Sequence, residues 1–221
     1  MSAADLRHVG TWIFDLDNTL YPPECEFMAL IDERMTVFVM RETGLAHVQA
    51  RALQRRYLDE HGTTLAGLVA HHGIDPHVFL DEVHDVSLDR LTPDGQLKLA
   101  LKRLPGRRLV FTNGSAAHAE RVLERLGVRT LFEAVFHLEA ADFTPKPRPA
   151  AYRALIEAHG VDPQRSAFFE DSERNLKPAA DLGMTTILVG PHAEGSLAPF
   201  VQHRTPKLAP FLLKVRVKEA A

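Results

Sequence analysis

The most constraining feature of this chain is an apolar segment, residues 9–16, that delivers Asp15 and Asp17 to its end. Aromatic and β-branched residues in such a run predict a buried strand of the parallel type. Because charges are almost never buried unpaired, the two carboxylates fit best just beyond the strand's carboxyl end, where ligands bind in open α/β sheets. Carboxylates this close repel each other unless a cation lies beside them, and Mg²⁺ prefers oxygen ligands. A plain Asp/Asn turn is the alternative.

Composition excludes several classes of protein. The 221 residues, 25% charged and 45% hydrophobic, allow one globular domain or one domain with an inserted lobe. A net charge of −3 gives no electrostatic footprint for a nucleic acid polymer. The single cysteine, Cys25, cannot form an internal disulfide, which favours a reducing compartment. We expect a cytoplasmic protein without membrane contact, since residues 1–10 do not resemble a signal peptide and no apolar stretch approaches the ~20 residues that span a bilayer.

Helical periodicity dominates the chain directly behind the first strand. Apolar residues recur at helical spacing from Phe27 to Phe38, and Gly44 ends this first helix. Three more helices are predicted at residues 46–60, 64–72 and 77–86. No segment between residues 22 and 91 has the pattern of a strand, so these residues are expected to form an all-helical cap domain.

Strands and helices then alternate, which predicts an α/β core with a parallel sheet. Residues 1–21 and 92–221 are expected to form this core. The predicted strands are residues 107–112, 134–138, 166–169 and 185–189, and the predicted helices are residues 93–104, 116–126, 148–159 and 175–182. Beyond residue 190 we expect an irregular tail with a short helix at residues 206–213 and a frayed end at residues 214–221.

The later strands also end in polar clusters. Thr112 and Asn113 precede a glycine at the start of a helix, where side chains and backbone N–H groups can bind phosphate, although a plain turn uses the same residues. Lys146 lies between two prolines, which restrict the backbone that carries it. A fixed ammonium there could neutralise charge on a phosphoryl group, although a solvated lysine is the simpler interpretation. Glu170 and Asp171 follow the next strand and could complete a metal site or cap a helix.

Together the clusters resemble the four motifs of the haloacid dehalogenase superfamily of phosphohydrolases. The matching positions, in motif order, are Asp15 to Thr19, Thr112 with Asn113, Lys146, and Glu170 with Asp171. The resemblance covers essentially the whole chain, and the helical insert matches a cap type found directly behind the first motif. It implies a Rossmann-like parallel sheet with an inserted helical cap.

The resemblance also implies roles for these residues. Asp15 would attack phosphorus and form an aspartyl-phosphate. Asp17 would protonate the leaving alcohol, later activate water, and ligate Mg²⁺ through its backbone carbonyl. Dehalogenases of the superfamily have no acid at this second position and use no metal. Asp17 therefore favours a phosphate ester over a halogenated acid as substrate.

The other matched residues would surround the transferring group. Thr112 and Asn113 would hold the phosphoryl oxygens, and Lys146 would stabilise their charge. Asp171 would ligate Mg²⁺ through its carboxylate. Glu170 would ligate the metal directly, act through water, or support the other ligands.

Finer similarities point to a subfamily. Residues 14–22, residues 61–68 of the cap, and Phe111 to Gly114 with His118 are similar to the pyrimidine 5′-nucleotidase group. The implied substrate is a pyrimidine nucleoside monophosphate such as UMP or CMP. Alternatives are a sugar-phosphate or phosphoglycolate phosphatase, a phosphomutase, or a binding protein without activity. The expected partner is a small phosphate ester, and the chain is expected to be a monomer or homodimer.

The cap is expected to choose the substrate, because it closes over the site and excludes water. His61, Thr63 and Thr64 fall in an interhelical loop that could face the core. Helix capping is the alternative role for the two threonines. Arg55 or Arg56 could approach an anionic ligand, but charge on a helix usually faces solvent.

Overall fold

The computed structural model describes residues 3–218 and contains one parallel sheet with strand order β3-β2-β1-β4-β5-β6. The strands are β1 (Thr11–Phe14), β2 (Arg107–Phe111), β3 (Ala134–Phe136), β4 (Ser166–Glu170), β5 (Thr185–Val189) and β6 (His203–Thr205). The predicted α/β class with a Rossmann-like parallel sheet is confirmed. In the centre of the sheet, Phe14 pairs with Val110 on one side and Phe169 on the other. The polar residues that follow these three strands therefore emerge at one edge.

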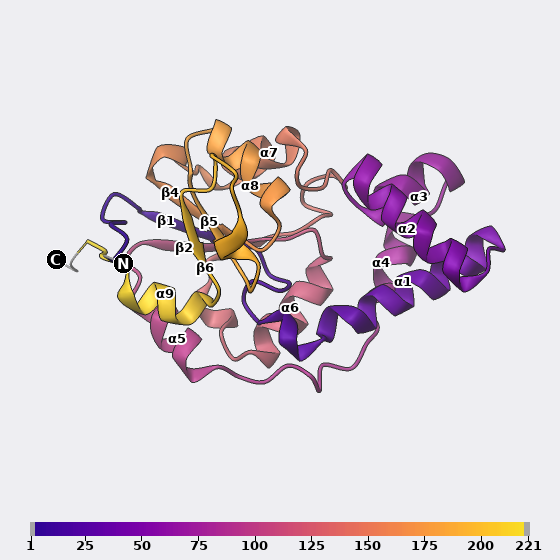
Figure 1. Cartoon of the computed structure of the whole chain (residues 1–221), viewed down its shortest axis with the longest axis horizontal. Coiled ribbons are helices and arrows are strands. Elements are labelled where there is room, and N and C mark those ends of the chain that lie inside the picture. Colours follow the sequence, from indigo (N-terminus) through magenta and orange to yellow (C-terminus); the bar gives the residue numbers. More distant parts are fainter. Residues whose placement is uncertain (1–2, 219–221) are drawn as a thin grey trace.

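Helices cover both faces of the sheet (Figure 1). The core helices are α5 (Gly95–Lys102), α6 (Ala116–Arg125), α7 (Pro149–His159), α8 (Glu173–Asp181) and α9 (Leu208–Lys214). Side chains alternate across β1: Trp12 and Phe14 pack in the cluster that includes α5, α6 and α9, while Ile13 packs in the cluster that includes α7 and α8. Both faces of the central strand are thus apolar, as expected for a parallel sheet covered on two sides.

The four remaining helices lie to one side of the sheet in Figure 1. They are α1 (Phe27–Thr43), α2 (His47–His61), α3 (Thr64–His72) and α4 (Pro76–His84). Local sequence explains their ends: Gly44 takes a left-handed conformation after α1, and the Thr63 hydroxyl accepts a hydrogen bond from Ala66 N–H at the start of α3. These helices fall inside the predicted cap, residues 22–91, and that boundary stays our interpretation of where the cap begins and ends.

Two predictions for the C-terminal part were wrong. The tail contains a sixth strand, β6, which the sequence did not reveal because its three residues, His203 to Thr205, carry no apolar run. The segment expected to fray is partly ordered, since Val215 is buried and Arg216 exchanges backbone hydrogen bonds with the N-terminal segment at Ala4 and Leu6. Residues 219–221 of that predicted end lie outside the described residues. Within residues 3–218, no helix combines the length and apolarity that a membrane crossing requires.

Candidate active site

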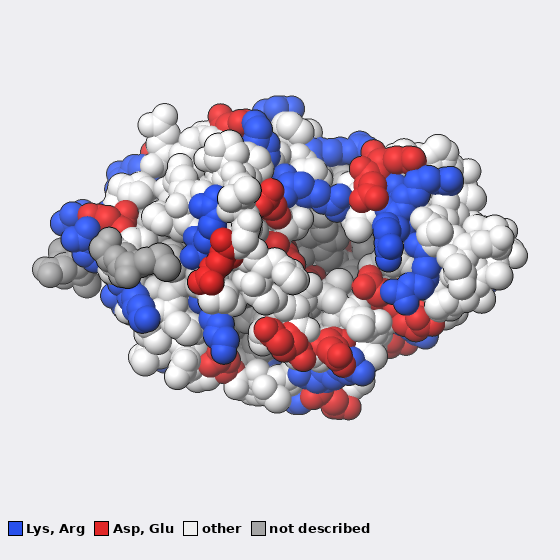
Figure 2. Space-filling view, in the orientation of Figure 1, with Lys and Arg blue, Asp and Glu red and all other residues white. Residues whose placement is uncertain are grey.

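A cavity of about 370 Å³ lies between the carboxyl edge of the sheet and the helices α1 to α4. Figure 2 shows it as a hollow in the surface, with basic side chains on the side of the helices. The core contributes the predicted residues Asp15, Asp17, Thr112, Asn113, Lys146, Glu170 and Asp171 to its lining. The structure therefore brings together every core residue that the sequence singled out.

Lys146 is the centre of the core side. Its side chain is only 1% exposed. The ammonium donates to Asp15 Oδ1 at 2.6 Å, to Glu170 Oε2 at 2.8 Å and to the Phe111 carbonyl at 2.8 Å. Burial disfavours the charged form, but the two carboxylates outweigh it and raise the pKa of Lys146 above its ordinary value. The sequence left a solvated lysine open, and the structure excludes it.

Asn113 fixes the loop that carries this lysine. Its side-chain Nδ2 donates to the Lys146 carbonyl at 3.1 Å, and its Oδ1 accepts from the Lys146 N–H at 2.8 Å. The amide thus joins two strand-end loops through one N–H and its oxygen. The second N–H of Nδ2 and the backbone N–H remain as donors that could reach a phosphoryl oxygen, and Asn113 lines the cavity.

Thr112 is placed differently. Its hydroxyl oxygen accepts from the Gly114 N–H at 2.9 Å, which fixes its position and leaves its own proton available to donate. The residue is 2% exposed and lines the cavity. A hydroxyl held in this way can donate to an anionic oxygen without reorienting.

Three carboxylates converge beside Lys146. Oxygens of Asp15, Glu170 and Asp171 lie within 4.8 Å of one another. Burial, followed by repulsion from Glu170, raises the pKa of Asp15 to about 7, and burial with repulsion from Asp15 raises that of Asp171 to about 6. Three acids face one ammonium, so the cluster lacks positive charge. Carboxylate oxygens in a pocket with excess negative charge are suitable ligands for Mg²⁺.

Glu170 is the least available of the three acids for a metal. Its Oε2 accepts from Lys146, and its Oε1 accepts from Asn175 Nδ2 at 3.0 Å and from the Ser172 N–H at 3.3 Å. These bonds hold the Glu170 carboxylate against Lys146. Each oxygen of Asp15 accepts one hydrogen bond, from Lys146 or from Thr19, which is fewer than the three bonds that Glu170 accepts. The buried Oδ1 of the neighbouring Asn175 has no hydrogen-bond partner within residues 3–218.

Asp17 is held by two residues that sequence reasoning did not assign to the site. Its Oδ1 accepts from the Tyr21 hydroxyl at 2.6 Å and contacts His118 Nε2 at 2.9 Å. Burial alone would raise the pKa of Asp17, but the charge of His118 and these hydrogen bonds lower it to about 2. His118 stacks in turn on His84 of α4, with ring centroids 4.2 Å apart. The sequence pointed to Tyr21 and His118 only through the similarity to the pyrimidine 5′-nucleotidase group, which included residues 14–22 and His118.

The predicted cap residues divide into two groups. Thr63 and Thr64 line the cavity, although Thr63 also caps α3 and Thr64 donates to the Gln54 carbonyl. His61 is absent from the lining, and its Nε2 lies 3.1 Å from that of His71 in α3. The structure thus brings the two threonines to the site and leaves His61 away from it.

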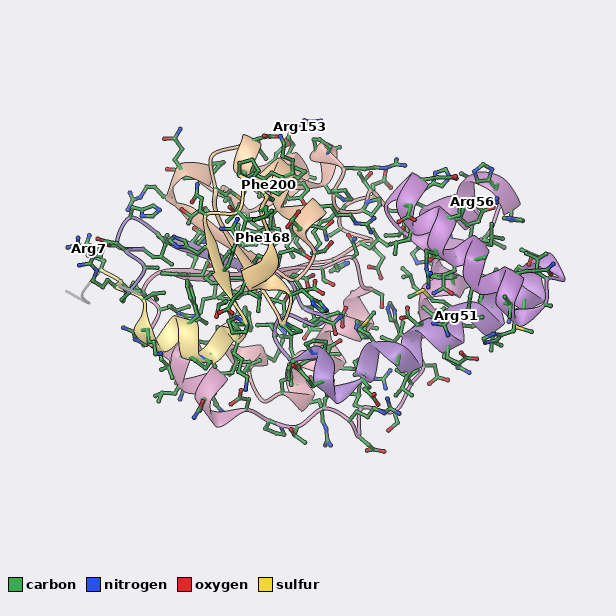
Figure 3. The ribbon with its side chains drawn as sticks, in the orientation of Figure 1. Arg7, Arg51, Arg56, Arg153, Phe168 and Phe200 are labelled. Atoms are coloured by element: carbon green, nitrogen blue, oxygen red, sulfur yellow. The ribbon has the colours of Figure 1, made fainter. Side chains whose placement is uncertain are left out.

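The arginines of α2 also divide. Arg55 lines the cavity, together with Arg51, which the sequence did not single out. The Arg56 guanidinium instead lies 5.6 Å from the centre of the Tyr57 ring. Figure 3 labels Arg51 and Arg56 beside the helices of the cap. Arg174, from the start of α8, bridges core and cap by donating to the carbonyls of Leu58 and Gly62 at 3.0 and 3.2 Å.

Comparison with known proteins agrees with this geometry. The profile of the haloacid dehalogenase-like hydrolases matches residues 9–183, which is most of the chain. The protein therefore belongs to the haloacid dehalogenase-like hydrolase family. The matched region includes the strand ends described above and the helices inserted after β1.

Two curated relatives are similar in sequence. Phosphate metabolism protein 8 of Saccharomyces cerevisiae is 28% identical over 193 residues, which cover 80% of this chain and 60% of that protein. Fructose-1-phosphate phosphatase YqaB of Escherichia coli is 32% identical over 122 residues, covering 52% of this chain and 63% of that protein. The chain thus spans somewhat less than two thirds of the length of each.

Solved structures share the fold at low sequence identity. A HAD phosphatase from Thermococcus onnurineus aligns with a TM-score of 0.61 and 16% identity over 90% of this chain and 94% of that chain. L-2-haloacid dehalogenase from Xanthobacter autotrophicus aligns with a TM-score of 0.58 and 18% identity over 93% and 97%. At these identities the likeness shows the architecture alone.

Proposed function

We propose that the protein is a Mg²⁺-dependent phosphatase that hydrolyses a phosphate monoester through an aspartyl-phosphate on Asp15. The observation that carries this proposal is the buried contact of Lys146 with Asp15 at 2.6 Å, beside the hydroxyl of Thr112. One oxygen of Asp15 faces the ammonium, and the other accepts from Thr19 at 3.1 Å. This arrangement orients a carboxylate nucleophile. It also places a positive charge where negative charge would develop on the phosphoryl oxygens.

In the first step, a carboxylate oxygen of Asp15 attacks phosphorus, the bond from phosphorus to the leaving oxygen breaks, and Asp17 gives that oxygen a proton. Thr112 and the backbone N–H of Asn113 hold the phosphoryl oxygens, while Lys146 neutralises their charge. Asp17 must carry a proton for this step. A dianionic phosphoryl group beside it raises its pKa, because like charge disfavours the ionised form.

In the second step, water attacks the phosphorus of the aspartyl-phosphate. Asp17, now a carboxylate, takes the proton from this water, the bond between phosphorus and Asp15 breaks, and inorganic phosphate leaves. The hydrogen bonds of Tyr21 and His118 to one oxygen of Asp17 leave its other oxygen for the leaving group and then for water.

Asp15, Asp171 and the backbone carbonyl of Asp17 would hold the metal, with Glu170 as their support. When bound, Mg²⁺ supplies charge that offsets the repulsion between the carboxylates and the phosphoryl group. The balance of three acids against one ammonium at this edge is the reason to expect it.

For the substrate we propose a pyrimidine nucleoside 5′-monophosphate, supported by the sequence similarity in residues 14–22 and 61–68. The second candidate is a sugar phosphate, favoured by the Escherichia coli relative, which is named a fructose-1-phosphate phosphatase. A cavity of about 370 Å³ accommodates a small organic ester of either kind.

The decisive assay measures phosphate release from UMP, CMP, fructose 1-phosphate and phosphoglycolate, with Mg²⁺, with excess chelator, and after Mg²⁺ is restored. We expect the highest kcat/KM for UMP and CMP, loss of activity in chelator and recovery on restoring the metal. A strong preference for fructose 1-phosphate or phosphoglycolate would overturn the nucleotide proposal. Full activity in excess chelator would overturn the metal role, and formation of an isomer without phosphate release would indicate a mutase.

A further inference from the structure

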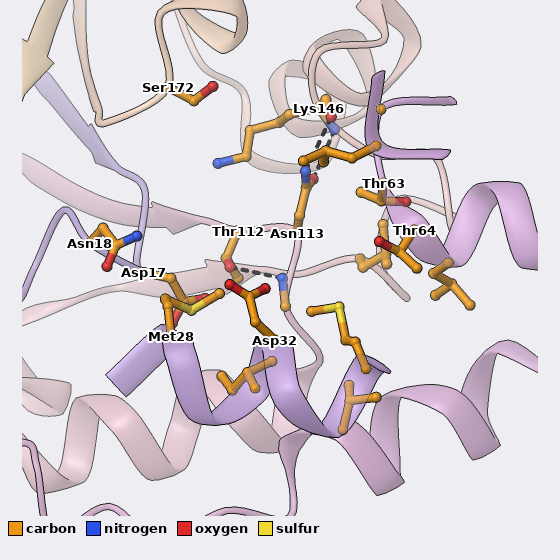
Figure 4. A pocket seen from close by; sticks show the side chains of 18 of the residues that line it. Asp17, Asn18, Met28, Asp32, Thr63, Thr64, Thr112, Asn113, Lys146 and Ser172 are labelled. Atoms are coloured by element: carbon orange, nitrogen blue, oxygen red, sulfur yellow. Dashed lines mark hydrogen bonds between the residues drawn. The ribbon is translucent and has the colours of Figure 1, made fainter. Parts of the chain in front are cut away.

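The cap wall of the cavity carries one carboxylate that the proposed mechanism does not use. Met28, Ile31, Asp32 and Met35 of α1 all line the cavity. Their spacing places them on one face of the helix, so this face consists of three apolar side chains and Asp32. Figure 4 shows the Asp32 carboxylate pointing from α1 into the cavity, on the side where Thr112 lies.

Asp32 has no partner that would explain its position. Within residues 3–218 its carboxylate makes no hydrogen bond and no ion pair. Apart from the backbone bonds of α1, the one hydrogen bond to this residue comes from the Thr36 hydroxyl to its backbone carbonyl. The residue is half-buried, and burial raises its pKa although nearby Arg51 opposes the shift. A carboxylate among methionines without a partner is unfavourable in the free protein. Its cost is offset when a ligand supplies the missing hydrogen bonds.

The chemistry of a carboxylate limits what that ligand is. An ionised carboxylate only accepts hydrogen bonds, and it repels a phosphoryl group that approaches it directly. The phosphoryl group has its own place beside Thr112 and Lys146. Asp32 therefore faces the alcohol part of the ester, and it favours an alcohol with hydrogen-bond donors on carbons near the ester bond.

We propose that Asp32 selects phosphate esters of polyhydroxylated alcohols, such as a ribose or another sugar, by accepting hydrogen bonds from their hydroxyl groups. This inference rests on the proposed phosphatase function and narrows its substrate class. It separates the open alternatives, because nucleotides and sugar phosphates carry such hydroxyls, whereas phosphoglycolate presents a carboxylate that Asp32 repels.

The test is a binding cycle that does not depend on turnover. Titration calorimetry measures the Kd of UMP and of its 2′,3′-dideoxy analogue for Asp15→Asn and for Asp15→Asn/Asp32→Asn. Fructose 1-phosphate and phenyl phosphate form a second pair with and without hydroxyls. Removing one negative charge from the cavity should strengthen the binding of all these anions alike. Only the ratio of Kd values within a pair therefore reports the hydrogen bonds to Asp32.

We expect Asp32→Asn to reduce the advantage of the hydroxylated ligand by roughly tenfold or more in at least one pair, as for a hydrogen bond to a charged group. The control Asp15→Asn/Glu33→Gln, altered at the next residue of α1, should keep the advantage, because Glu33 is exposed and contacts His47. An unchanged ratio in both pairs, or no binding of any ligand, overturns the role of Asp32. If the hydroxylated ligands bind selectively but the wild type releases no phosphate, the phosphatase proposal is overturned and the role of Asp32 in binding stands.

Discussion

The two walls of the cavity differ in how completely their polar groups are partnered. On the core wall, the Lys146 ammonium has three hydrogen bonds, Asp15 has a partner for each oxygen, and the Asn113 side chain bonds the Lys146 backbone twice. On the cap wall, Thr63 and Thr64 are hydrogen-bonded, but the side chains of Asp32 and Arg55 make no hydrogen bond or ion pair with another described residue. The partnered wall is already organised before any ligand arrives. On the cap wall, the side chains of Asp32 and Arg55 are free to form hydrogen bonds with a ligand.

This difference assigns separate tasks to the two walls. Preorganised groups lower the barrier of a reaction because they need not reorient as charge develops. Free groups beside a cavity discriminate between ligands, because a ligand that leaves them unpaired is bound less well. We therefore interpret the core wall as the place of chemistry and the cap wall as the place of selection.

The largest expected effect comes from the core nucleophile. Asp15→Asn keeps the shape of the side chain but removes the attacking oxygen's charge, so phosphate release should fall by about four orders of magnitude. Steady-state assays with UMP and p-nitrophenyl phosphate measure this loss. Asp142→Asn, the same change at an exposed carboxylate, should remain close to wild type. Equal activity of Asp15→Asn and wild type would contradict the assignment of chemistry to the core wall.

The next effect concerns the residues that hold Asp17. Tyr21→Phe and His118→Gln each weaken the contacts that orient its carboxylate, at 2.6 and 2.9 Å. We expect kcat to fall by roughly 10–100-fold in each variant with little change in KM, because misplacement of an acid-base group costs rate more than affinity. His47→Gln, at a partly exposed histidine of the cap, is the control. A change confined to KM would show that the two residues act on binding instead.

The stability of the protein should depend on pH through His84 of the cap, which stacks on His118 of the core. Burial, followed by the charge of His118, lowers the pKa of His84 to about 3, whereas an unfolded histidine titrates near 6.5. The neutral ring is therefore favoured in the folded protein, and its stabilising contribution is complete above pH ~6.5 and is lost as the pH falls towards 3. At pH 5 the loss should reach about 2 kcal/mol.

Urea unfolding of wild type and His84→Gln at pH 7.5 and pH 5 measures this contribution. The difference between the two proteins removes the effect of Asp15, Glu170 and Asp171, whose raised pKa values make their contribution to stability grow as the pH falls. If the free energy of unfolding depended on pH equally in both proteins, His84 would not be held neutral in the folded protein.

The smallest expected effect lies at the contact between Arg174 and the end of α2. Arg174→Gln removes the bonds to the Leu58 and Gly62 carbonyls, which are partly exposed and contribute modestly. We expect KM to rise about threefold with kcat nearly unchanged, since the cap is held less firmly over the bound ester. Faster hydrogen exchange at residues 58–62 should accompany it, and unchanged exchange would show that Arg174 does not hold this loop.

The sequence predicted the core wall better than the cap wall for a physical reason. Acids and hydroxyls at the ends of parallel strands must meet at one edge, so Asp15, Thr112 and Asp171 could be placed together without coordinates. No comparable rule brings helix residues together. Asp32 and Arg55 have the pattern of a solvated helix face, and only the packing of α1 and α2 turns them towards the core. His118 contacts Asp17 across 101 positions of sequence.

The most direct test of the account asks where the phosphoryl group resides during turnover. Asp17→Asn should still be phosphorylated by p-nitrophenyl phosphate, whose leaving group needs no proton, but it should release phosphate slowly because water is no longer activated. Acid quenching followed by peptide mass spectrometry should then find a phosphoryl group on Asp15. Phosphorylation of another residue, or none in this variant while the wild type turns over, would contradict the account.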